Sequence, residues 1–296
     1  SEIQDLQTNL QAAKTAVTTK GGTVTDSGLA GLASEIASIP SGGSLANYGS
    51  ITYLDDNNAE QTLTLATEDD FVELCVGGSG SNIVINGITV NKNKIIALTV
   101  ADGVSYLPNH FCYGCNYLAS ATIPSSIHYI GGDVFSNTII NTALNLSNVR
   151  YVGSGFMSSN TAYNQPTSLP KVDVIGASFL ASCTSFNSTI TINDNTRIIQ
   201  QRFLYGCTAF AQPFSVPSGI ETNIEAYFLG GCPQFTGPLT CNTDKIASSN
   251  NTLSTGNASA PMYVTGVTLT GTYAQAWKDA LPDRTSSPYR KLIVES

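Results

Sequence analysis

The chain has 296 residues, of which 42% are hydrophobic and only 11% are charged, and its formal net charge is -8. The length and apolar content exclude a disordered chain, while the acidic balance and the lack of a Lys/Arg cluster argue against nucleic acid as a partner. No apolar run approaches the roughly 18 residues that span a bilayer, and the opening SEIQDLQTNL is too polar for a secretory signal, so we expect no membrane insertion.

Residues 1–43 are expected to form two helices. Apolar residues recur at heptad spacing in the first, at Ile3, Leu6, Leu10, Ala13 and Val17. Asp26 or Ser27 caps the second, which carries Leu29, Leu32, Ile36 and Ile39 and ends at Pro40. The pair forms either a hairpin packed on itself or a docking and oligomerising segment. Because so short a segment buries little surface alone, we favour docking, with a homo-oligomer, preferably a trimer, as the expected assembly.

The same segment, LQTNLQAAKTAVTTKGGTVTDSGLAGLASEIASIPSGG, resembles the opening of tail or appendage proteins of phages, particularly those of Gram-positive hosts. The resemblance implies attachment to other virion proteins through residues 1–43. Residues 44–96 then alternate apolar and polar side chains in SITYL, QTLTLA, FVELCV and NIVINGITV, which predicts antiparallel strands with a DDNN turn between the first two. We expect this small β region to cap the N-terminal end of residues 97–240.

A repeat dominates residues 97–240. Its anchor is a phenylalanine that recurs in steps of 24, 21, 23, 24 and 25 residues, at Phe111, Phe135, Phe156, Phe179, Phe203 and Phe228. Apolar residues also stand four before and seven after the anchor. Units of this size bury such a face only by stacking, so the pattern predicts a leucine-rich-repeat-type solenoid of about six repeats of 21–25 residues, each with one strand and a short turn or helix. With a C-terminal cap over 241–296, the fold class is α+β.

Four of the seven cysteines stand four residues after an anchor, at Cys115, Cys183, Cys207 and Cys232. We interpret them as a buried packing column of free thiols. A Cys207–Cys232 disulfide and a metal site are the alternatives, although the C-x-x-C of Cys112 and Cys115 has no second ligand pair. An odd number of cysteines, which includes Cys75 and Cys241, leaves at least one thiol free.

The segments IPSSIHYIGGDVF, LPKVDVIGASFLASCTSF and VPSGIETNIEAYFLGGCPQF resemble BspA-like leucine-rich repeats, in which Pro, Ile, Phe and Cys recur together. The tail APMYVTGVTLTGTYAQAWKDALPDRTSSPYRKLIV is similar to the C-terminal cap of that family, a strand and then a short helix. Tyr273 and Trp277 would lie on one face of that helix and cover the end of the core.

No catalytic site is predicted. His110 and His128 stand at different offsets from their anchors, and we interpret both as surface or packing residues. The acidic clusters Asp55, Asp56 and Glu68, Asp69, Asp70 are interpreted as solvated loops, with adventitious calcium as the alternative. Phosphate-loop, G-x-S-x-G and H-E-x-x-H motifs are absent from the sequence. We therefore expect no enzyme activity, no cofactor and no metal.

These patterns favour a structural protein of a phage virion, a head, neck or tail appendage made in the host cytoplasm. Its solenoid would bind a protein or glycan of the host surface. A bacterial or protist BspA-like adhesin and an architectural virion protein without a receptor are the alternatives. Exposed tyrosines suit such binding, and the candidates are Tyr106, Tyr113, Tyr151 and Tyr205, whose common face the sequence does not define.

Overall fold

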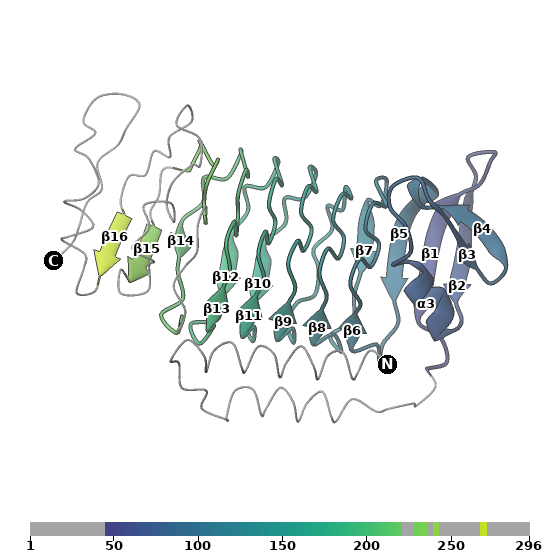
Figure 1. Ribbon diagram of the computed structural model, residues 1–296, viewed down its shortest axis with the longest axis horizontal. Coiled ribbons are helices and arrows are strands. Elements are labelled where there is room, and N and C mark those ends of the chain that lie inside the picture. The colour runs from purple at the N-terminus through teal and green to yellow at the C-terminus, as the bar shows by residue number, and fades with distance from the viewer. Residues whose placement is uncertain (1–44, 221–227, 236–238, 243–266, 271–296) are drawn as a thin grey trace. The chain divides into compact units, whose positions relative to one another are not determined.

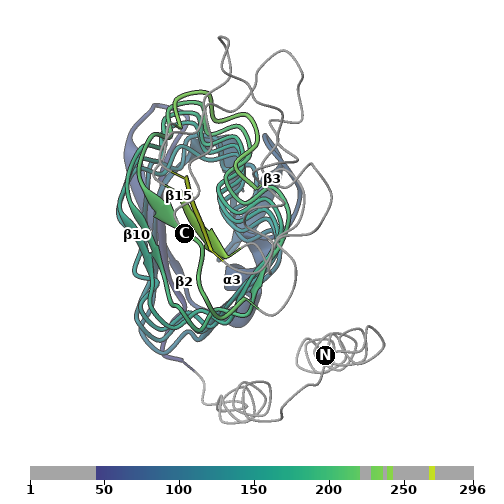
Figure 2. The ribbon, with the colours of Figure 1, turned by 90° about the vertical axis from the view of Figure 1, so that its left-hand side faces the viewer.

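A computed structural model describes residues 45–220, 228–235, 239–242 and 267–270 of the chain. Short parallel strands stack from coil to coil, where a coil is one turn of the solenoid (Figure 1). One sheet has five of them, in the order β13-β11-β9-β8-β6. Their bounds are Tyr106–Leu107 (β6), Tyr129–Ile130 (β8), Tyr151–Val152 (β9), Val174–Ile175 (β11) and Ile198–Ile199 (β13). Viewed along the stack, the coils superpose as a closed outline around the core (Figure 2).

A second series of strands precedes these in the coils, so a coil has two short strands where we predicted one. It comprises β7 (Ser120–Thr122), β10 (Thr167–Leu169), β12 (Ile190–Ile192), β14 (Phe214–Ser215), β15 (Leu239–Asn242) and β16 (Val267–Thr270). β10 pairs with β12, and β15 lies between β14 and β16, all in parallel. The predicted solenoid is therefore confirmed, and its regular elements are short strands joined by turns.

The anchor residues form one buried column, meaning a set of equivalent positions in successive coils. Rings of consecutive coils stack in its second half, with centroids 5.4 Å apart for Phe156 and Phe179 and 5.2 Å apart for Phe179 and Phe203. The prediction was wrong by one residue in the second copy. The N–H of Met157 donates to Val134 O (2.9 Å), as that of Leu180 donates to Phe156 O, so Val134 and not Phe135 occupies the anchor column.

Across the residues that the structure describes, the chain around the anchors forms a series of turns and no helix. Non-glycine residues with positive φ alternate there, as at Ser178, Leu180 and Ser182. A helix would direct the N–H groups along the segment, whereas here the N–H of Leu180 donates to the preceding coil (Phe156 O, 3.0 Å) and that of Ser182 to the next (Tyr205 O, 2.6 Å). These bonds offset the roughly 1–2 kcal/mol that a left-handed conformation costs a residue such as Leu180.

The column four residues after the anchor is buried throughout, at Cys115, Thr138, Asn160, Cys183, Cys207 and Cys232. Its later thiols donate to carbonyls of the preceding coil: Cys183 to Met157 O (3.2 Å), Cys207 to Leu180 O (3.1 Å) and Cys232 to Leu204 O (3.0 Å). The six described cysteines are free thiols, so the alternative Cys207–Cys232 disulfide is not formed. Cys241 lies where side chains are not described.

The apolar column predicted seven residues after the anchor is also present, at Leu118, Tyr163, Phe186, Phe210 and Phe235, and in the second coil it is occupied by Ile140, six residues after Val134. Tyr163, which we had not predicted there, stacks on Phe186 with centroids 5.8 Å apart. The next position forms an asparagine ladder in which Oδ1 of Asn141 accepts from the N–H of Asn164, and Oδ1 of Asn164 from that of Asn187 (3.0 and 2.8 Å). The coils are thus held in one register on this side as well.

The segment before the first repeat extends the solenoid sheet at its end. β1 (Gly49–Leu54) pairs antiparallel with β2 (Glu60–Leu65) on one side and with β5 (Ile95–Val100) on the other, and β5 runs parallel to β7. Phe71 continues the anchor column, with its ring centroid 4.5 Å from that of Phe111. Core residues of this segment therefore cover the open face of the first coil.

The predicted strand FVELCV is wrong, because residues Glu68–Glu73 form the helix α3. Thr67 and Asp70 make a capping box: the Thr67 side chain accepts from the Asp70 N–H, and the Asp70 side chain accepts from the Thr67 N–H (3.1 and 3.0 Å). β3 (Asn82–Ile85) and β4 (Ile88–Asn91) form a hairpin, and the short 3-10 helix η1 (Lys92–Lys94) follows. Asn86 and Gly87, which form the two-residue turn of the β3–β4 hairpin, both have positive φ.

Two expectations lie outside the described residues. They are the helices of residues 1–43 and the C-terminal helix with Tyr273 and Trp277. Of the predicted strand and helix at the C-terminus, the strand β16 is described. In the part of the chain that is described, no helix combines the length and the apolarity of a membrane span.

Candidate binding surface

The outer side of the five-stranded sheet carries the candidate binding surface. In each of its strands the second residue is buried and the first is half-buried, because side chains alternate across a strand. The half-buried residues form a continuous row, which we call the tyrosine face: Tyr106, Tyr129, Tyr151, Val174 and Ile198. Backbone pairing fixes the spacing of this row, since Tyr129 is registered with Tyr106 and with Tyr151.

The tyrosines of this face are held in defined positions. Tyr129 and Tyr151 stack with ring centroids 4.8 Å apart and 4° between their planes. Tyr106 donates its hydroxyl to Glu68 Oε1 (2.8 Å) and meets Phe71 edge to face. Burial raises the pKa of Tyr129 to about 12 and also raises that of Tyr151, so both are protonated at neutral pH. Within the described ranges their two hydroxyls form no hydrogen bond, which leaves them for a ligand.

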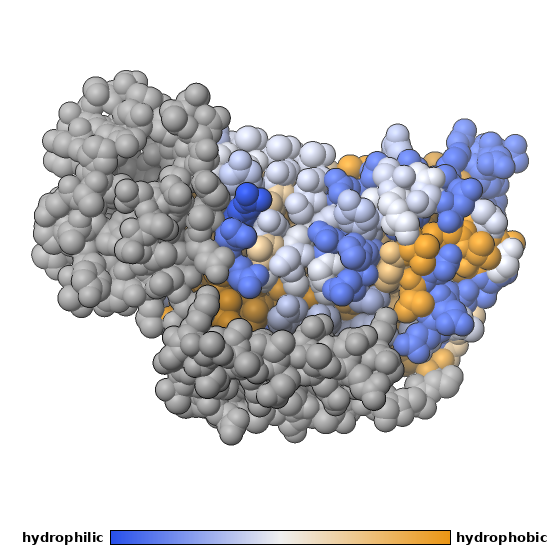
Figure 3. Space-filling model, viewed as in Figure 1, coloured by the Kyte–Doolittle hydropathy of each residue, from blue (hydrophilic) through white to orange (hydrophobic). Residues whose placement is uncertain are grey.

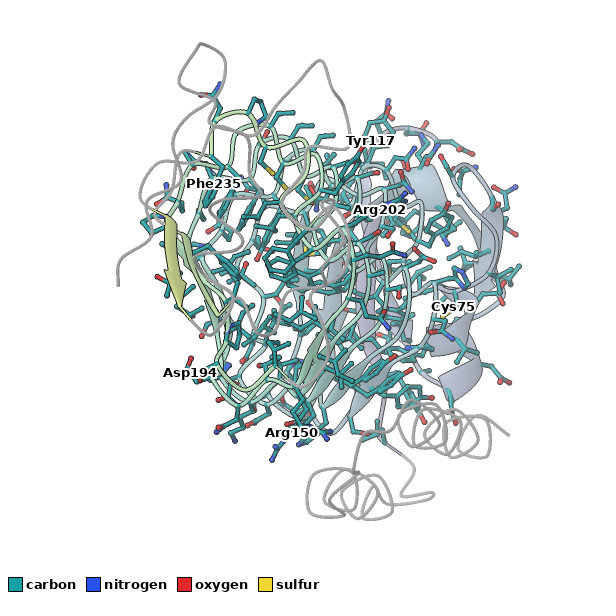
Figure 4. The ribbon with its side chains drawn as sticks, turned by 60° about the vertical axis from the view of Figure 1, so that its left-hand side comes forward. Cys75, Tyr117, Arg150, Asp194, Arg202 and Phe235 are labelled. Atoms are coloured by element: carbon teal, nitrogen blue, oxygen red, sulfur yellow. The ribbon has the colours of Figure 1, made fainter. Side chains whose placement is uncertain are left out.

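Residues with ionisable side chains stand directly before four of the five strands, at His128, Arg150, Asp173 and Arg197, and we call this row the charged border of the tyrosine face. Arg150 Nη1 lies 3.7 Å from Asp173 Oδ2, and both side chains are at least a fifth exposed. Such a pair adds little stability but orients the guanidinium. Figure 4 shows Arg150 at one edge of the coils and Tyr117 at the opposite edge. The charged border thus places two arginines, Arg150 and Arg197, beside the tyrosine face of a protein whose net charge is -8.

The four candidate tyrosines divide between two sides of the solenoid. Tyr106 and Tyr151 lie on the tyrosine face, together with Tyr129, which we had missed. Tyr113 and Tyr205 lie in the turn segments, where the coils between them carry Ser136, Ser158 and Ala181 at the equivalent position. Arg202 covers the Tyr205 ring at 5.7 Å. Of these two groups of tyrosines, the one on the tyrosine face occupies adjacent coils, at Tyr106, Tyr129 and Tyr151.

The two histidines lie in different columns, as their offsets predicted. His128 is in the charged border. His110 Nε2 is 3.6 Å from Asp133 Oδ2, and both side chains are about half exposed. The His110 imidazole also contacts the Tyr113 ring edge to face. Neither histidine faces a second titratable group in a buried setting, so this geometry does not form an acid–base pair.

The acidic clusters have structural roles. Asp55 accepts from the N–H groups of Ala59 and Asn57 and from Gln61 Nε2, and these bonds, that of Ala59 first, lower its pKa. Glu68, Asp69 and Asp70 form the first turn of α3 and not a loop. Asp56 follows Asp55 into the turn between β1 and β2. Across the residues that the structure describes, no three His, Cys, Asp or Glu side chains are grouped as metal ligands.

A separate apolar patch lies at the N-terminal end of the solenoid. Val84 and Ile88 of the β3–β4 hairpin are 51% and 44% exposed, and Val76 is 49% exposed. Figure 3 shows apolar surface gathered over this hairpin. The patch lies on the hairpin and not on the five-stranded sheet, so it does not extend the tyrosine face.

Comparison with known proteins identifies the repeat. Residues 85–211 match the model of the BspA type leucine rich repeat region, in six copies. The match confirms the predicted repeat type over that range. No curated protein and no solved structure matched the chain. The predicted likeness of residues 1–43 to phage tail proteins gains no support from these comparisons.

Proposed function

We propose, for a chain whose residues 85–211 carry BspA-type leucine-rich repeats, that the solenoid is an adhesive module. It binds a component of a cell surface through the tyrosine face and its charged border. The observation that carries the proposal is the unbroken row Tyr106, Tyr129 and Tyr151 on adjacent coils. Repeats of this type suggest surface adhesion or binding, which is the alternative given above and the better supported one.

The chemistry of the face favours a protein as the partner. Tyrosine and arginine are the side chains that most often dominate protein interfaces, and here the tyrosine rings are already ordered by stacking. Ordering before binding lowers the entropy lost when a partner docks. The protonated hydroxyls and the guanidinium of Arg150 supply directional hydrogen bonds beside the apolar row. A glycan is the other candidate ligand, and the assay below distinguishes the two.

We infer a binding role without catalysis, because binding requires only this surface. The virion hypothesis remains a proposal of the sequence: residues 1–43 would attach the protein to other virion proteins as a homo-oligomer, preferably a trimer. Removing residues 1–43 separates the two candidates. An adhesin keeps its cell binding after the deletion, whereas a virion component loses its attachment to the particle.

The test compares three full-length proteins: the parent, the double variant Tyr129→Ala/Tyr151→Ala, and the matched control Tyr113→Ala/Tyr205→Ala. Each is labelled and titrated onto bacterial and epithelial cells, with and without prior protease or glycosidase treatment of the cells. We expect the first variant to weaken binding at least about tenfold and the control to weaken it less than about twofold. Loss of binding after protease treatment identifies a protein partner, and loss after glycosidase a glycan. Equal effects of the two variants, with both folded by circular dichroism, would refute the tyrosine face as the site.

A further inference from the structure

Lys92 carries a fully buried ammonium group, and it lies where the segment before the first repeat meets the first coil. Its side chain is 0% exposed, and Nζ donates to three backbone carbonyls, those of Leu74 (3.2 Å), Val76 (3.1 Å) and Gly77 (3.3 Å). Among the described residues it forms no ion pair with a carboxylate. Burying a charge without an opposite charge is costly, so a lysine in such a place indicates a nearby group whose negative form the ammonium stabilises.

Two cysteines lie beside it. The N–H of Cys112 donates to the same Leu74 carbonyl as Lys92 Nζ (3.1 Å), which brings the ammonium next to the turn of Cys112. The N–H of Cys115 donates to Cys112 O (3.2 Å), so the two residues are the ends of a hydrogen-bonded turn. Such ends lie within about 7 Å at Cα, which overlaps the separation of about 4.4–6.8 Å that a disulfide needs. Both thiols are fully buried, and they hydrogen-bond to each other.

Cys112 breaks the pattern of its column. The equivalent positions of the other coils hold large apolar residues: Phe135, Met157, Leu180, Leu204 and Leu229. Packing alone would favour another such residue here. Among the coils that the structure describes, the first is therefore the one that holds a second cysteine of its own beside the column, and the buried Lys92 lies next to it.

The two thiols are also electrostatically unequal. The hydrogen bond from Cys112 lowers the pKa of Cys115 despite burial, and the charge of Lys92 lowers it further. Burial, together with donation to Cys115, raises the pKa of Cys112. By contrast, burial raises the pKa of Cys183 and Cys232 to about 12, so the later thiols of the column stay protonated. Cys115 therefore loses its proton more readily than Cys112, and a thiolate beside a thiol is the pair that disulfide chemistry requires.

We propose that Cys112 and Cys115, assisted by Lys92, form a redox-active dithiol that a hydroperoxide oxidises to a disulfide. The Cys115 thiolate attacks one peroxide oxygen, breaks the O–O bond and becomes a sulfenic acid, and the hydroxide released takes up a proton. The Cys112 sulfur then attacks the sulfenic sulfur, and its own proton leaves with the sulfenic oxygen as water. Two electrons pass from the two sulfurs to the peroxide, and two water molecules form from hydrogen peroxide.

The experiment exposes the full-length protein to hydrogen peroxide, stops the reaction with N-ethylmaleimide in guanidinium chloride and locates each modified cysteine by peptide mass. We expect a Cys112–Cys115 disulfide that forms at least about tenfold faster than Cys183, Cys207 or Cys232 loses its thiol. Cys115→Ser abolishes the disulfide, whereas the matched control Cys207→Ser leaves its rate unchanged. Lys92→Met slows it about tenfold, equivalent to about one pKa unit at the attacking thiolate.

The selectivity in the parent protein needs no variant, so the test holds even if Lys92→Met fails to fold. Both thiols persisting at a peroxide dose that oxidises Cys75, which is partly exposed, would overturn the proposal. A Cys75–Cys112 disulfide would overturn it too. The proposal is independent of cell binding by the tyrosine face, because the readout is the mass of the cysteine peptides.

Discussion

Replacing Phe179 by alanine tests the stacked anchor column directly. The Phe179 ring is 0% exposed and lies between Phe156 and Phe203, with centroids 5.4 and 5.2 Å away and interplanar angles of 21° and 8°. Removing a buried phenylalanine ring costs about 3–5 kcal/mol, and each stacked pair contributes about 0.5–1.5 kcal/mol. Because two pairs are lost at one site, we expect the upper part of that range, about 4–5 kcal/mol of the free energy of unfolding.

Urea denaturation followed by circular dichroism measures this loss. Tyr117→Ala is the control, because that ring is 59% exposed, and its expected effect is within about 0.5 kcal/mol. Phe179→Leu, which keeps most of the volume, should fall between the two. A cost below about 2 kcal/mol for Phe179→Ala would refute the reasoning, since it would mean that neighbouring coils close the gap or that the ring is not packed as described.

Three further predictions concern the backbone, the thiols and the helix cap. Gly153→Ala should cost at least about 2 kcal/mol, because a Cβ there would lie 2.5 Å from the carbonyl carbon of Gly131, whereas Gly78→Ala, with its nearest atom 3.8 Å away, should stay within about 0.5 kcal/mol in the same urea assay. Burial raises the pKa of Cys183 and Cys232 from 9.0 to about 12. Each thiol's contribution to the free energy of unfolding is therefore complete below pH 9 and falls as the pH rises towards 12, by about 1.4 kcal/mol per thiol at pH 10. This would be contradicted by a Cys183→Ala/Cys232→Ala protein whose free energy of unfolding falls as much as that of the parent between pH 8 and 10. Burial pushes the pKa of Asp70 up, but hydrogen bonds from the N–H groups of Asn86, Thr67 and Ala66 and the Thr67 hydroxyl outweigh it and lower the pKa. Asp70→Ala should therefore cost about 1–2 kcal/mol at neutral pH and much less below pH 3, with faster hydrogen exchange in α3 and at Asn86 as the local readout.

The register of the second coil shows how sequence reasoning failed locally. Aligning on the aromatic ring selected Phe135, because Val134 lacks the ring that marks the other anchors. The backbone hydrogen bonds select Val134 instead, and Ile130 then stands four residues before the anchor like its counterparts. Tyr129 was missed for the same reason. With the correct register it occupies the position of Tyr106 and Tyr151, just before a buried aliphatic residue.

The FVELCV segment shows a different limit. Its alternation suits a strand, but six residues are too few for periodicity to separate a strand from a short helix. The spacing of Thr67 and Asp70 was visible in the sequence as a capping box, and it was the better indicator. The Cys112–Cys115 motif was also visible, although Lys92, twenty positions earlier than Cys112, shares no local pattern with it.

The sequence by itself determined the repeat and its core, because every coil must bury the same offsets against its neighbours. Phe179, Cys183 and Phe186 could therefore be assigned to buried columns from the repeat spacing alone. Only the tertiary structure decided which exposed residues lie together, because stacking places residues about one repeat apart side by side while small shifts in repeat length change the register. Thus Tyr129 and Tyr151 became one surface, Tyr113 and Tyr205 separated from it, and a lysine of the N-terminal segment reached two thiols of the first coil.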